Sequence, residues 1–441
     1  MLFRSVATRL LHGYRQAGHQ SALAVGRING QTEDGIHHIP SGYGFLGAGL
    51  GTLSEGARSL IGRVSGSGRA SKFLDLVSRP PSVIDWWRGH EDFNYPGTEK
   101  LLTLTPERPD IVHAHNLHGG YFDLRKLPEL SAAILFVLNP HDAWLAAGHC
   151  AHSFDCERWT TGCGECPDLK LHHAIRQDGS AANWEAKRRI YERSRLYVST
   201  ASQWLMDRLE RSILQPGVVE SKVIHYGIET DLFRPGNKEE IRRELDIPPE
   251  SVVLLFVARG LRTNRWKDYA TLEDALQWVA SRAEGKRILF LGLGDVGPSR
   301  RQGDVEVRFV SFESAKSRVA RFYQAADVYI HPAKVDTAPQ TVMEAMGCGI
   351  PVIASAVAGI PEQVKSLGPG RFDPDDATGI LVPPGDVEAM ARAILGLALD
   401  GELRARLGRN ARRDTLERFD VKVYVSAFLN WFEEILETEH R

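Results

Sequence analysis

The sequence predicts an α/β protein that has two domains and mostly parallel sheets. Its 441 residues are more than one domain usually holds. In the second half of the chain, short apolar runs alternate with amphipathic helical segments, which is typical of a parallel sheet with helices on both faces. The runs expected as strands are 252–257, 287–291, 307–310, 328–330, 352–354 and 379–382.

Composition narrows the class of protein further. The net charge of -2 does not favour a nucleic-acid partner, and five cysteines in so long a chain do not form a secreted disulfide scaffold. No run approaches the roughly twenty apolar residues of a membrane helix, and no secretory signal opens the chain. We therefore predict a cytoplasmic protein, and this composition is compatible with peripheral contact with a membrane.

The N-terminal half begins with a helical pattern. Residues 4–17 have apolar side chains at helical spacing, and 21–25 suits a short strand. A Rossmann-like half normally opens with a strand and a glycine-rich turn, so we expect a gap in this sheet. The cause we favour is a start codon assigned too far downstream, which would leave this chain poorly active. A long insertion with short helices is expected over 26–100. A loop followed by a strand is expected over 108–116, and further strands and helices are expected at 133–138, 184–194, 196–200 and 203–211.

The stretch from His331 to Val364 organises the second half. Pro339 suits the first position of a short helix, which Gly347 ends, and a buried strand follows. This pattern places Asp336 and the helix N-terminus beside the ends of parallel strands, where ligands of open α/β sheets bind. The free N–H groups of the helix favour a phosphate, and Glu344 is suited to accept hydrogen bonds from sugar hydroxyls.

A basic loop follows the strand at 252–257. Arg259, Arg262, Arg265 and Lys267 stand within nine residues, and arginine and lysine together suit a pyrophosphate. Arg259 is the first candidate for the arginine that accompanies Lys267. The alternative is a solvated basic loop that binds no ligand. Gly292-Leu293-Gly294-Asp295-Val296-Gly297 matches G-x-G-x-x-G, but Pro298 and a polar loop follow where a dinucleotide fingerprint needs a helix.

Four of the five cysteines lie close together in the segment 149–169. Cys150, Cys156, Cys163 and Cys166 are suited to a tetrahedral zinc site, and the last two form C-x-x-C. The alternatives are two disulfides or reduced thiols in a loop.

Three of these segments resemble the GT4 family of retaining GT-B glycosyltransferases. The run MEAMGCGIPVIAS is similar to the family's donor-site run LEAMACGTPVVAS, and Asp336 has the first acidic position, as in a branch with D-N-x-P-N-T-V-L-E-A. Residues 223–235 resemble the family's interdomain linker I-x-N-G-I-D-x-x-x-F-x-P. The segment 149–169 with the preceding HDAW resembles a branch associated with exopolysaccharide and antigen assembly.

The resemblance implies a GT-B fold of two Rossmann-like domains that face a cleft. Residues 1–234 would form the acceptor side and 235–419 the nucleotide-sugar donor domain, with a C-terminal helix at 420–441 that returns to the first domain. The implied reaction moves a sugar, with retention, from a nucleotide sugar to a hydroxyl of a saccharide or lipid-linked saccharide, in polysaccharide or glycoconjugate assembly. The alternative is an inactive nucleotide-sugar-binding or scaffold protein of the same fold.

The same resemblance implies roles for individual residues. The catalytic set is His141, Asp336 and Glu344, with His141 facing the reacting carbon and Asp336 near the donor sugar. The donor-binding set is Arg259, Lys267, Glu344 and Thr341. The two cations would neutralise the leaving diphosphate, so that no cofactor is required for catalysis, and any zinc at the cysteines would be structural.

Overall fold

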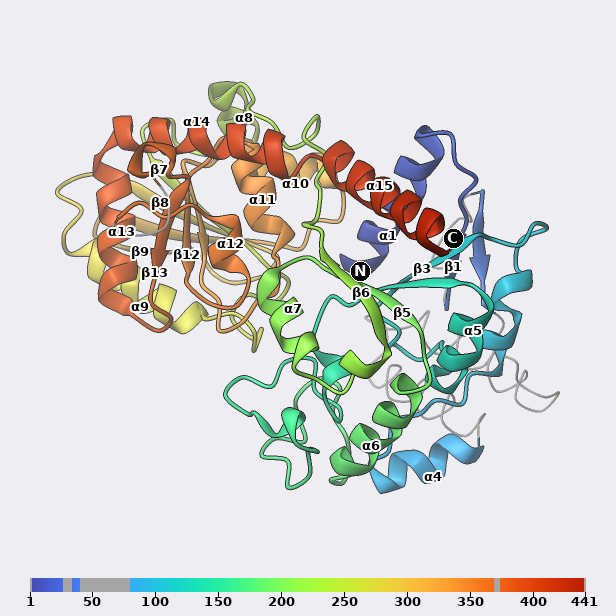
Figure 1. Cartoon of the computed structure of the whole chain (residues 1–441). Coiled ribbons are helices and arrows are strands. Elements are labelled where there is room, and N and C mark those ends of the chain that lie inside the picture. The colour runs from blue at the N-terminus through green and yellow to red at the C-terminus, as the bar shows by residue number, and fades with distance from the viewer. Residues whose placement is uncertain (1, 27–33, 40–79, 369–372, 440–441) are drawn as a thin grey trace. The chain divides into compact units, whose positions relative to one another are not determined.

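The computed structural model describes residues 2–26, 34–39, 80–368 and 373–439. The chain divides into two compact units, which Figure 1 shows (Figure 1). Unit 1 comprises residues 1–200 with 205–223, and unit 2 comprises 201–204 with 224–441. The predicted domain assignment, with its boundary after residue 234 and a returning helix, stays a prediction.

Unit 2 contains a seven-stranded sheet in the order β13-β12-β11-β7-β8-β10-β9. All neighbouring pairs are parallel except β9 with β10. The six strands predicted from apolar runs are confirmed, whereas β9 lies where we predicted a loop. Its Arg-Arg-Gln sequence is fully exposed at the sheet edge and therefore has no apolar signal. The strands are β7 (Val252–Val257), β8 (Ile288–Leu293), β9 (Arg300–Gln302), β10 (Val305–Val310), β11 (Val328–His331), β12 (Val352–Ser355) and β13 (Gly379–Val382).

The order of these strands places helices on both faces of the sheet. The connection from β7 through α9 (Tyr269–Ala280) to β8 runs in one direction across the sheet. The connections through α10 (Lys316–Ala325) and α11 (Gln340–Gly347) run in the other, and right-handed crossovers then cover opposite faces. The direction changes between β7 and β11, so this is the point where a ligand of the sheet is expected to bind.

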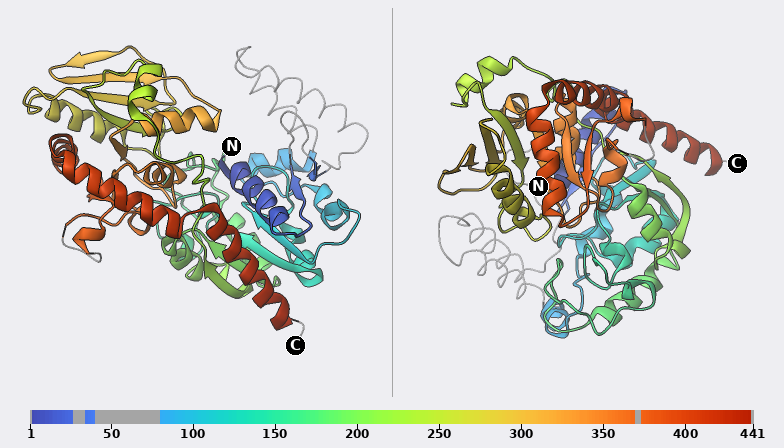
Figure 2. Two further views of the ribbon diagram at one scale, coloured as in Figure 1. Left: turned by 90° about the horizontal axis from the view of Figure 1, so that it is seen from above. Right: turned by 90° about the vertical axis from the view of Figure 1, so that its left-hand side faces the viewer.

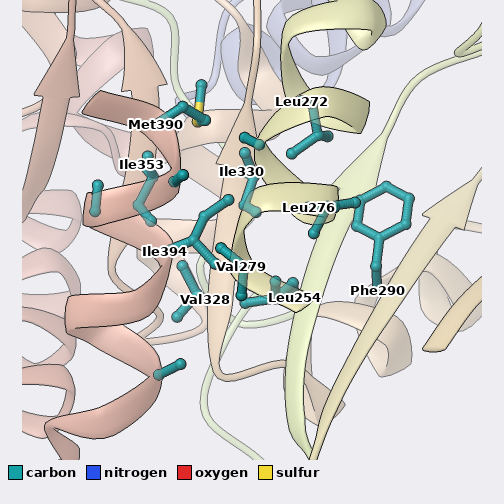
Figure 3. Packing of buried hydrophobic residues seen from close by; sticks show 14 of the residues in the cluster. Leu254, Leu272, Leu276, Val279, Phe290, Val328, Ile330, Ile353, Met390 and Ile394 are labelled. Carbon is teal, nitrogen blue, oxygen red and sulfur yellow. The ribbon is translucent and has the colours of Figure 1, made fainter. Parts of the chain in front are cut away.

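The core of unit 2 lies between the sheet and two helices. Figure 3 shows Leu272, Leu276 and Val279 of α9 packed against strand residues such as Ile330, with Ile394 of α13 beside them (Figure 3). These side chains are 0–3% exposed, which explains why the buried strands are continuous apolar runs in the sequence. The remaining helices of the unit are α8 (Lys238–Glu244), α12 (Ile360–Gln363), α13 (Val387–Leu399), α14 (Gly401–Arg418) and α15 (Val421–Glu439).

The end of the chain is helical, as predicted for 421–436. Figure 2 shows α14 and α15 in red as two consecutive helices (Figure 2). Asp420, the second of the two residues between them, forms a parallel bridge with Ile228. The Gly227 position is so close that a Cβ there would lie 2.8 Å from the Val421 Cα. The segment that resembles the family linker is thus fixed against the start of α15. Among the described residues, no helix is long and apolar enough to span a membrane.

Unit 1 contains a four-stranded parallel sheet in the order β3-β4-β5-β6 and a separate parallel pair, β1-β2. The sequence did not predict β6, because the strand has the sequence VVESKV with three polar residues in its middle. Its side chains are half-buried or exposed, so it lacks an apolar pattern. The strands are β1 (Leu23–Val25), β2 (Ile36–His38), β3 (Ile111–His115), β4 (Leu135–Asn139), β5 (Leu196–Thr200) and β6 (Val218–Val223).

The helices of unit 1 agree with the sequence pattern where it was regular. The described chain opens with α1 (Leu2–Gln16), as predicted, and the described strands fall into two separate sheets. The downstream-start explanation stays a prediction. Most of the predicted insertion, 27–33 and 40–79, lies outside the described residues. The described part of this insertion contains α4 (Pro80–Arg88) and the 3-10 helix η1 (Pro96–Thr103). The other α-helices of the unit are α5 (Leu127–Ala133), α6 (Ser180–Tyr191) and α7 (Gln203–Glu210).

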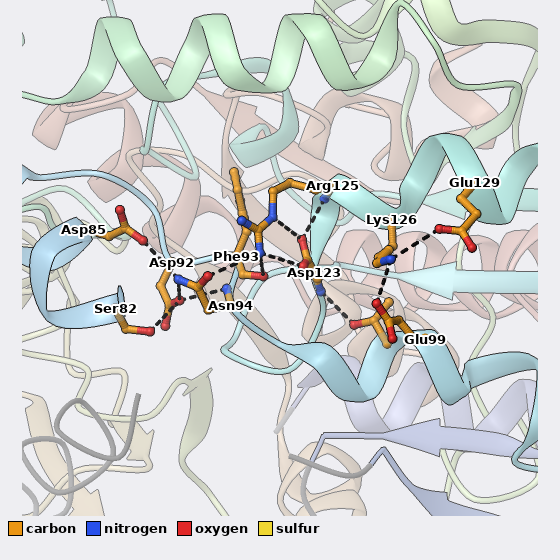
Figure 4. Close-up of polar contacts among 11 residues, drawn as sticks. Ser82, Asp85, Asp92, Phe93, Asn94, Glu99, Asp123, Arg125, Lys126 and Glu129 are labelled. Carbon is orange, nitrogen blue, oxygen red and sulfur yellow. Dashed lines mark hydrogen bonds and ion pairs between the residues drawn. The ribbon is translucent and has the colours of Figure 1, made fainter. Parts of the chain in front are cut away.

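A polar network joins α4 to the segment before α5. Figure 4 shows the Asp92 carboxylate accepting from the Ser82 hydroxyl at 2.9 Å, while the Asn94 amide donates to Asp85 at 3.0 Å (Figure 4). Arg125 pairs with the Asp123 carboxylate at 2.8 Å and also donates to the Asn94 side chain. Neutral groups and partly exposed ions make up this network, so we expect it to fix the loop geometry more than to add stability.

Candidate functional site

The loops after β7 and β11 meet at the point where the sheet changes direction. The backbone of Lys267 forms an antiparallel bridge with Ala333. On either side of it, the Asp268 N–H donates to the Pro332 carbonyl at 3.1 Å and the Lys334 N–H to the Trp266 carbonyl at 3.0 Å. These bonds bring two loops that are distant in sequence into register, and they set the Lys267 side chain beside the groups that follow β11.

Lys267 and Asp336 form an ion pair at this point. The Lys267 Nζ lies 2.5 Å from Asp336 Oδ2 and 2.9 Å from His331 Nε2. Burial by itself raises the pKa of Asp336, but the charge of Lys267 and its hydrogen bond to the carboxylate outweigh it and hold that pKa well below its usual range. Asp336 is therefore a carboxylate at neutral pH, and it neutralises one charge of the basic loop.

His331, the last residue of β11, is fully buried between charged and polar groups. Its Nδ1 lies 3.1 Å from the Tyr329 hydroxyl, and the Thr341 side chain hydrogen-bonds to that same tyrosine. Burial, with the nearby positive charge of Lys267, lowers the pKa of His331 to about 4. The predicted donor-site residues Lys267, Asp336 and Thr341 thus belong to one hydrogen-bonded network, in which the sequence had not singled out His331 or Tyr329.

Glu344 lies on α11, where the helical pattern placed it. Its Oε2 accepts a hydrogen bond from the Tyr323 hydroxyl at 3.1 Å. The helix starts at Gln340, so that Pro339 is the residue before the first turn rather than within it, one position from the prediction. Its φ of −64° suits either position. The hydrogen bond from Tyr323 restrains the half-buried Glu344 side chain. Its predicted binding of sugar hydroxyls stays a prediction.

The three arginines of the basic loop differ in their partners. Arg262 donates to the Asp295 carboxylate, with its Nη2 3.2 Å from Oδ1, and also to the Val296 carbonyl, so that its charge is matched. Arg265 lies over the Trp266 ring at 5.6 Å. Among the described residues, no carboxylate pairs with the exposed Arg259, whose guanidinium lies 5.3 Å from the Phe312 ring centroid. Arg259 is therefore the arginine of this loop with the most charge to offer an anion.

The G-x-G-x-x-G run has the backbone of a loop. β8 ends at Leu293, and the described residues 294–299 contain no helix, so the dinucleotide context is absent, as the sequence predicted. Gly294 has φ +110°, and a Cβ there would lie 2.2 Å from the Ala258 carbonyl oxygen. This glycine is thus needed for the close approach of two loops at the sheet end.

His141 follows β4 in unit 1 and is buried. Its backbone N–H donates to the Asn116 side-chain oxygen at 2.8 Å, and its Nε2 lies 3.1 Å from His115 Nδ1. The ring centroids of His113 and His115 are 4.3 Å apart, so the two side chains lie on one face of β3. Burial holds the pKa of His141 well below its usual range, with the neighbouring His115 adding to the effect. A neutral imidazole is therefore present at neutral pH, and its catalytic role stays a prediction.

Unit 1 contains a second lysine cluster, which the sequence analysis did not predict. Lys187, in a helix predicted only as charged, is fully buried and pairs with the Glu91 carboxylate at 2.9 Å. Its Nζ donates to the Trp144 and Ala147 carbonyls, each at 2.9 Å. Next to it, His118 pairs with Asp142 at 3.0 Å. The HDAW segment is thus fixed by the side chains of Lys187, His118 and Glu91, whose carboxylate accepts a hydrogen bond from the Trp144 indole N–H.

The cysteines predicted as zinc ligands all carry free thiols in this structure. Burial raises the pKa of Cys150 to about 12, and the neighbouring Cys163, Cys166 and Cys156 add to the effect. His149 Nε2 lies 3.2 Å from the Cys166 sulfur. Within the described part of the chain, no group of three or more His, Cys, Asp or Glu side chains is placed to hold a metal ion. The side chains as they stand do not form a zinc ligand set, and metal binding stays a prediction.

Solved structures with the same architecture define the fold class. Sucrose-phosphate synthase from Thermosynechococcus elongatus superimposes with a TM-score of 0.59 at 18% identity, over 98% of this chain and 93% of that one. WaaG, a glycosyltransferase involved in lipopolysaccharide biosynthesis, has a TM-score of 0.59 at 15% identity, over 96% of this chain and 94% of that one. Anabaena Alr3699/HepE, solved in complex with UDP, has a TM-score of 0.53 at 18% identity, over 77% and 82%. The protein therefore has the GT-B fold.

Sequence comparisons match part of the second unit to a known family. Residues 237–414 match the family Glycosyl transferases group 1. Two D-inositol 3-phosphate glycosyltransferases are similar: that of Saccharomonospora viridis is 29% identical over 49% of this chain and 50% of its own length, and that of Mycobacteroides abscessus is 30% identical over 52% and 48%. The chain spans about half the length of the curated relatives it matches.

Proposed function

We propose that this protein is a retaining glycosyltransferase that moves a sugar from a nucleotide sugar to a hydroxyl acceptor. The observation that carries the proposal is the position of Lys267, whose ammonium lies at the point where the unit 2 sheet changes direction, beside the acidic residues of a group 1 glycosyltransferase region. That position is where open α/β sheets bind ligands, and an ammonium there suits a diphosphate.

The chemistry needs stabilisation of the leaving group more than a strong nucleophile. Lys267 and Arg259, which has no carboxylate partner among the described residues, would bind the diphosphate as the glycosidic bond breaks, because fixed cations are most effective where negative charge develops. Glu344 and Thr341 would bind donor hydroxyls, and Asp336 would lie near the donor sugar. His141, which belongs to unit 1, is assigned to the acceptor side by the resemblance alone.

The substrate classes rest on weaker support and are part of the proposal. UDP is bound in the Anabaena HepE structure, which makes UDP-sugars the first donors to test. The acceptor named for the sequence relatives is D-inositol 3-phosphate. The resemblance of the cysteine segment to a polysaccharide-assembly branch favours instead a saccharide or lipid-linked saccharide, with a role in polysaccharide or glycoconjugate assembly.

A thermal-shift screen of the full chain against UDP-, GDP- and ADP-sugars tests donor binding, because a ligand of the folded state raises the melting temperature. The expected result is a shift with one nucleotide class that Lys267→Ala reduces. Donor hydrolysis without acceptor then separates a transferase from an inactive binding protein, which would show the shift and no turnover. NMR of the first-formed product, with the α or β configuration compared with that of the donor, tests retention.

A structural zinc in the cysteine segment is a separate proposal with its own test. Elemental analysis of the purified protein is expected to find about one zinc per chain, and a Cys163→Ser/Cys166→Ser variant is expected to lose it. A metal content near zero in protein purified without chelator would remove zinc from this account, in agreement with the present positions of the thiols.

A further inference from the structure

His331 lies at the centre of the Lys267 network, and the proposed transfer reaction does not yet assign it a role. Its side chain is fully buried, whereas that of Lys267 is 11% exposed and that of Asp336 is 25% exposed. The groups that face its ring are Lys267 and Asp336 at Nε2, Tyr329 at Nδ1, and the Phe256 ring with its centroid 6.3 Å away. A buried imidazole that contacts both an ammonium and a carboxylate must have one defined pattern of donors and acceptors.

The distances select one tautomer. The Lys267 ammonium has three donors and no acceptor, so at 2.9 Å from Nε2 it needs a lone pair there. The carboxylate of Asp336 is farther, at 3.3 Å, and it is already bound by the ammonium at 2.5 Å. The ring proton then belongs on Nδ1, which donates to the Tyr329 hydroxyl oxygen at 3.1 Å. The tautomer is thus inferred from the network around the ring.

We propose that His331 is a positioning residue for Lys267: as a neutral imidazole it accepts a hydrogen bond from the ammonium and, with Asp336, leaves the third N–H of the lysine for an anionic group of the donor. This inference rests on the proposed function. Its physical basis is that a flexible lysine side chain otherwise pays rotamer entropy when it binds a ligand, and two fixed acceptors have already restricted it.

The inference differs measurably from the more direct alternative, in which a charged His331 binds the phosphate itself. A cationic histidine would strengthen binding as the pH falls through about 6.5. Burial and the lysine charge instead lower the pKa of His331 to about 4, so its neutral form prevails from pH 8 to 5.5. We therefore expect the ratio of affinities of the parent protein and a His331→Gln variant to be independent of pH in that range, because the titration of the nucleotide cancels in the ratio.

The experiment measures UDP and GDP binding to the full chain by calorimetry. His331→Leu, which removes the acceptor, is expected to weaken the affinity of the preferred nucleotide by about 5- to 20-fold, and His331→Gln to recover most of it. In a Lys267→Ala background, His331→Leu is expected to change the affinity by less than about twofold, because the lysine through which it acts is gone. His225→Leu is the matched control: its Nδ1 bonds to the Ala201 carbonyl within the same unit, and its affinity should equal that of the parent.

The outcomes of this experiment distinguish a failure of the proposed function from a failure of the role assigned to His331. If the parent binds neither nucleotide, the proposed function and this inference both fall. If Lys267→Ala weakens binding while folded His331→Leu and His331→Gln bind as the parent does, only the inference falls. A loss in His331→Leu that is undiminished in the Lys267→Ala background, or a parent-to-glutamine ratio that rises as the pH falls, would likewise overturn it. Circular-dichroism melting of every variant identifies those that are folded, and His331→Gln keeps the test decisive if the leucine variant is not.

Discussion

Two of the lysines that pair with a carboxylate, one in each unit, differ in how many of their N–H groups are used. Lys187 in unit 1 is fully buried, with its Nζ bonded to Glu91 and to the Trp144 and Ala147 carbonyls, and 3.9 Å from the Trp144 ring centroid. Lys267 in unit 2 has two side-chain partners and is 11% exposed. A lysine whose three donors all bind protein is structural, whereas one with a donor to spare and access to solvent is suited to a ligand.

The two ion pairs also differ in the direction in which the pKa values of their members are shifted. Burial outweighs the attraction at the unit 1 pair, so that the pKa of Glu91 is raised and that of Lys187 is lowered. At the unit 2 pair the charge of Lys267 and the hydrogen bonds prevail, and the pKa of Asp336 is lowered. Desolvation thus exceeds the attraction in the first pair, whereas in the second pair the attraction exceeds the desolvation of Asp336.

The largest effect is expected from breaking the buried pair. Lys187→Met should lower the free energy of unfolding by about 3–5 kcal/mol, because it leaves the Glu91 carboxylate buried without its positively charged partner. Urea unfolding measures the change. A Lys187→Met/Glu91→Leu double variant should regain part of the loss, and Lys100→Met, at an exposed position, should lie within about 0.5 kcal/mol of the parent. A small effect of Lys187→Met would mean that water reaches the pair.

Acid should destabilise unit 1 through its histidines. Burial lowers the pKa of His115 to about 4, so between pH 6.5 and 4 the unfolded chain binds a proton there that the folded chain does not. Stability therefore falls as the pH drops through this window, by up to about 3 kcal/mol for this residue. A His115→Gln variant should lose correspondingly less than the parent. Hydrogen exchange resolved by peptide should place the difference in unit 1, and equal pH slopes of the two proteins would contradict the prediction.

Lys267→Ala should affect binding more than folding. Nucleoside diphosphate affinity is expected to fall by about 1.5–3 kcal/mol, the range for a hydrogen bond to a charged group. The melting temperature should change far less than in Lys187→Met, because the partly exposed Asp336 that remains is reached by solvent. Calorimetry with UDP and GDP is the measurement, and equal affinity in variant and parent would remove Lys267 from the site.

The sequence predicted the sheet of unit 2 well because its central strands are buried on both faces. The sequence missed Ile36–His38, which lies in the segment predicted as an insertion with short helices. The other two strands it missed, Arg300–Gln302 and Val218–Val223, lie at sheet edges, where half of the residues or more meet solvent and the apolar pattern is lost. Lys267 and Asp336 were each predicted for the donor site from local motifs. Their direct contact across 69 residues was not, because it depends on β7 and β11 being neighbours, and the strand order is not a local property.

The burial of Lys187 is a second feature that the sequence did not predict. Its helix contains Glu185, Lys187, Arg188 and Arg189, a composition typical of a solvated face, and only the tertiary structure shows that one of these charges points inward. His331 escaped notice for a similar reason. A histidine at the end of a strand has many structural uses, and its role depends on which groups the adjoining loops bring to each ring nitrogen.

The smallest expected effect separates two arginines of the basic loop. Arg259→Ala should weaken nucleoside diphosphate binding by about 1 kcal/mol or more, since its charge has no carboxylate partner among the described residues. Arg262→Ala should change the affinity by less than about 0.5 kcal/mol, because Asp295 already matches that charge. Both side chains are exposed, so neither change should unfold the protein. The comparison uses the same calorimetry, and a larger loss from Arg262→Ala would mean that ligand binding breaks the Asp295 pair and that the unliganded partners of this loop do not predict its function.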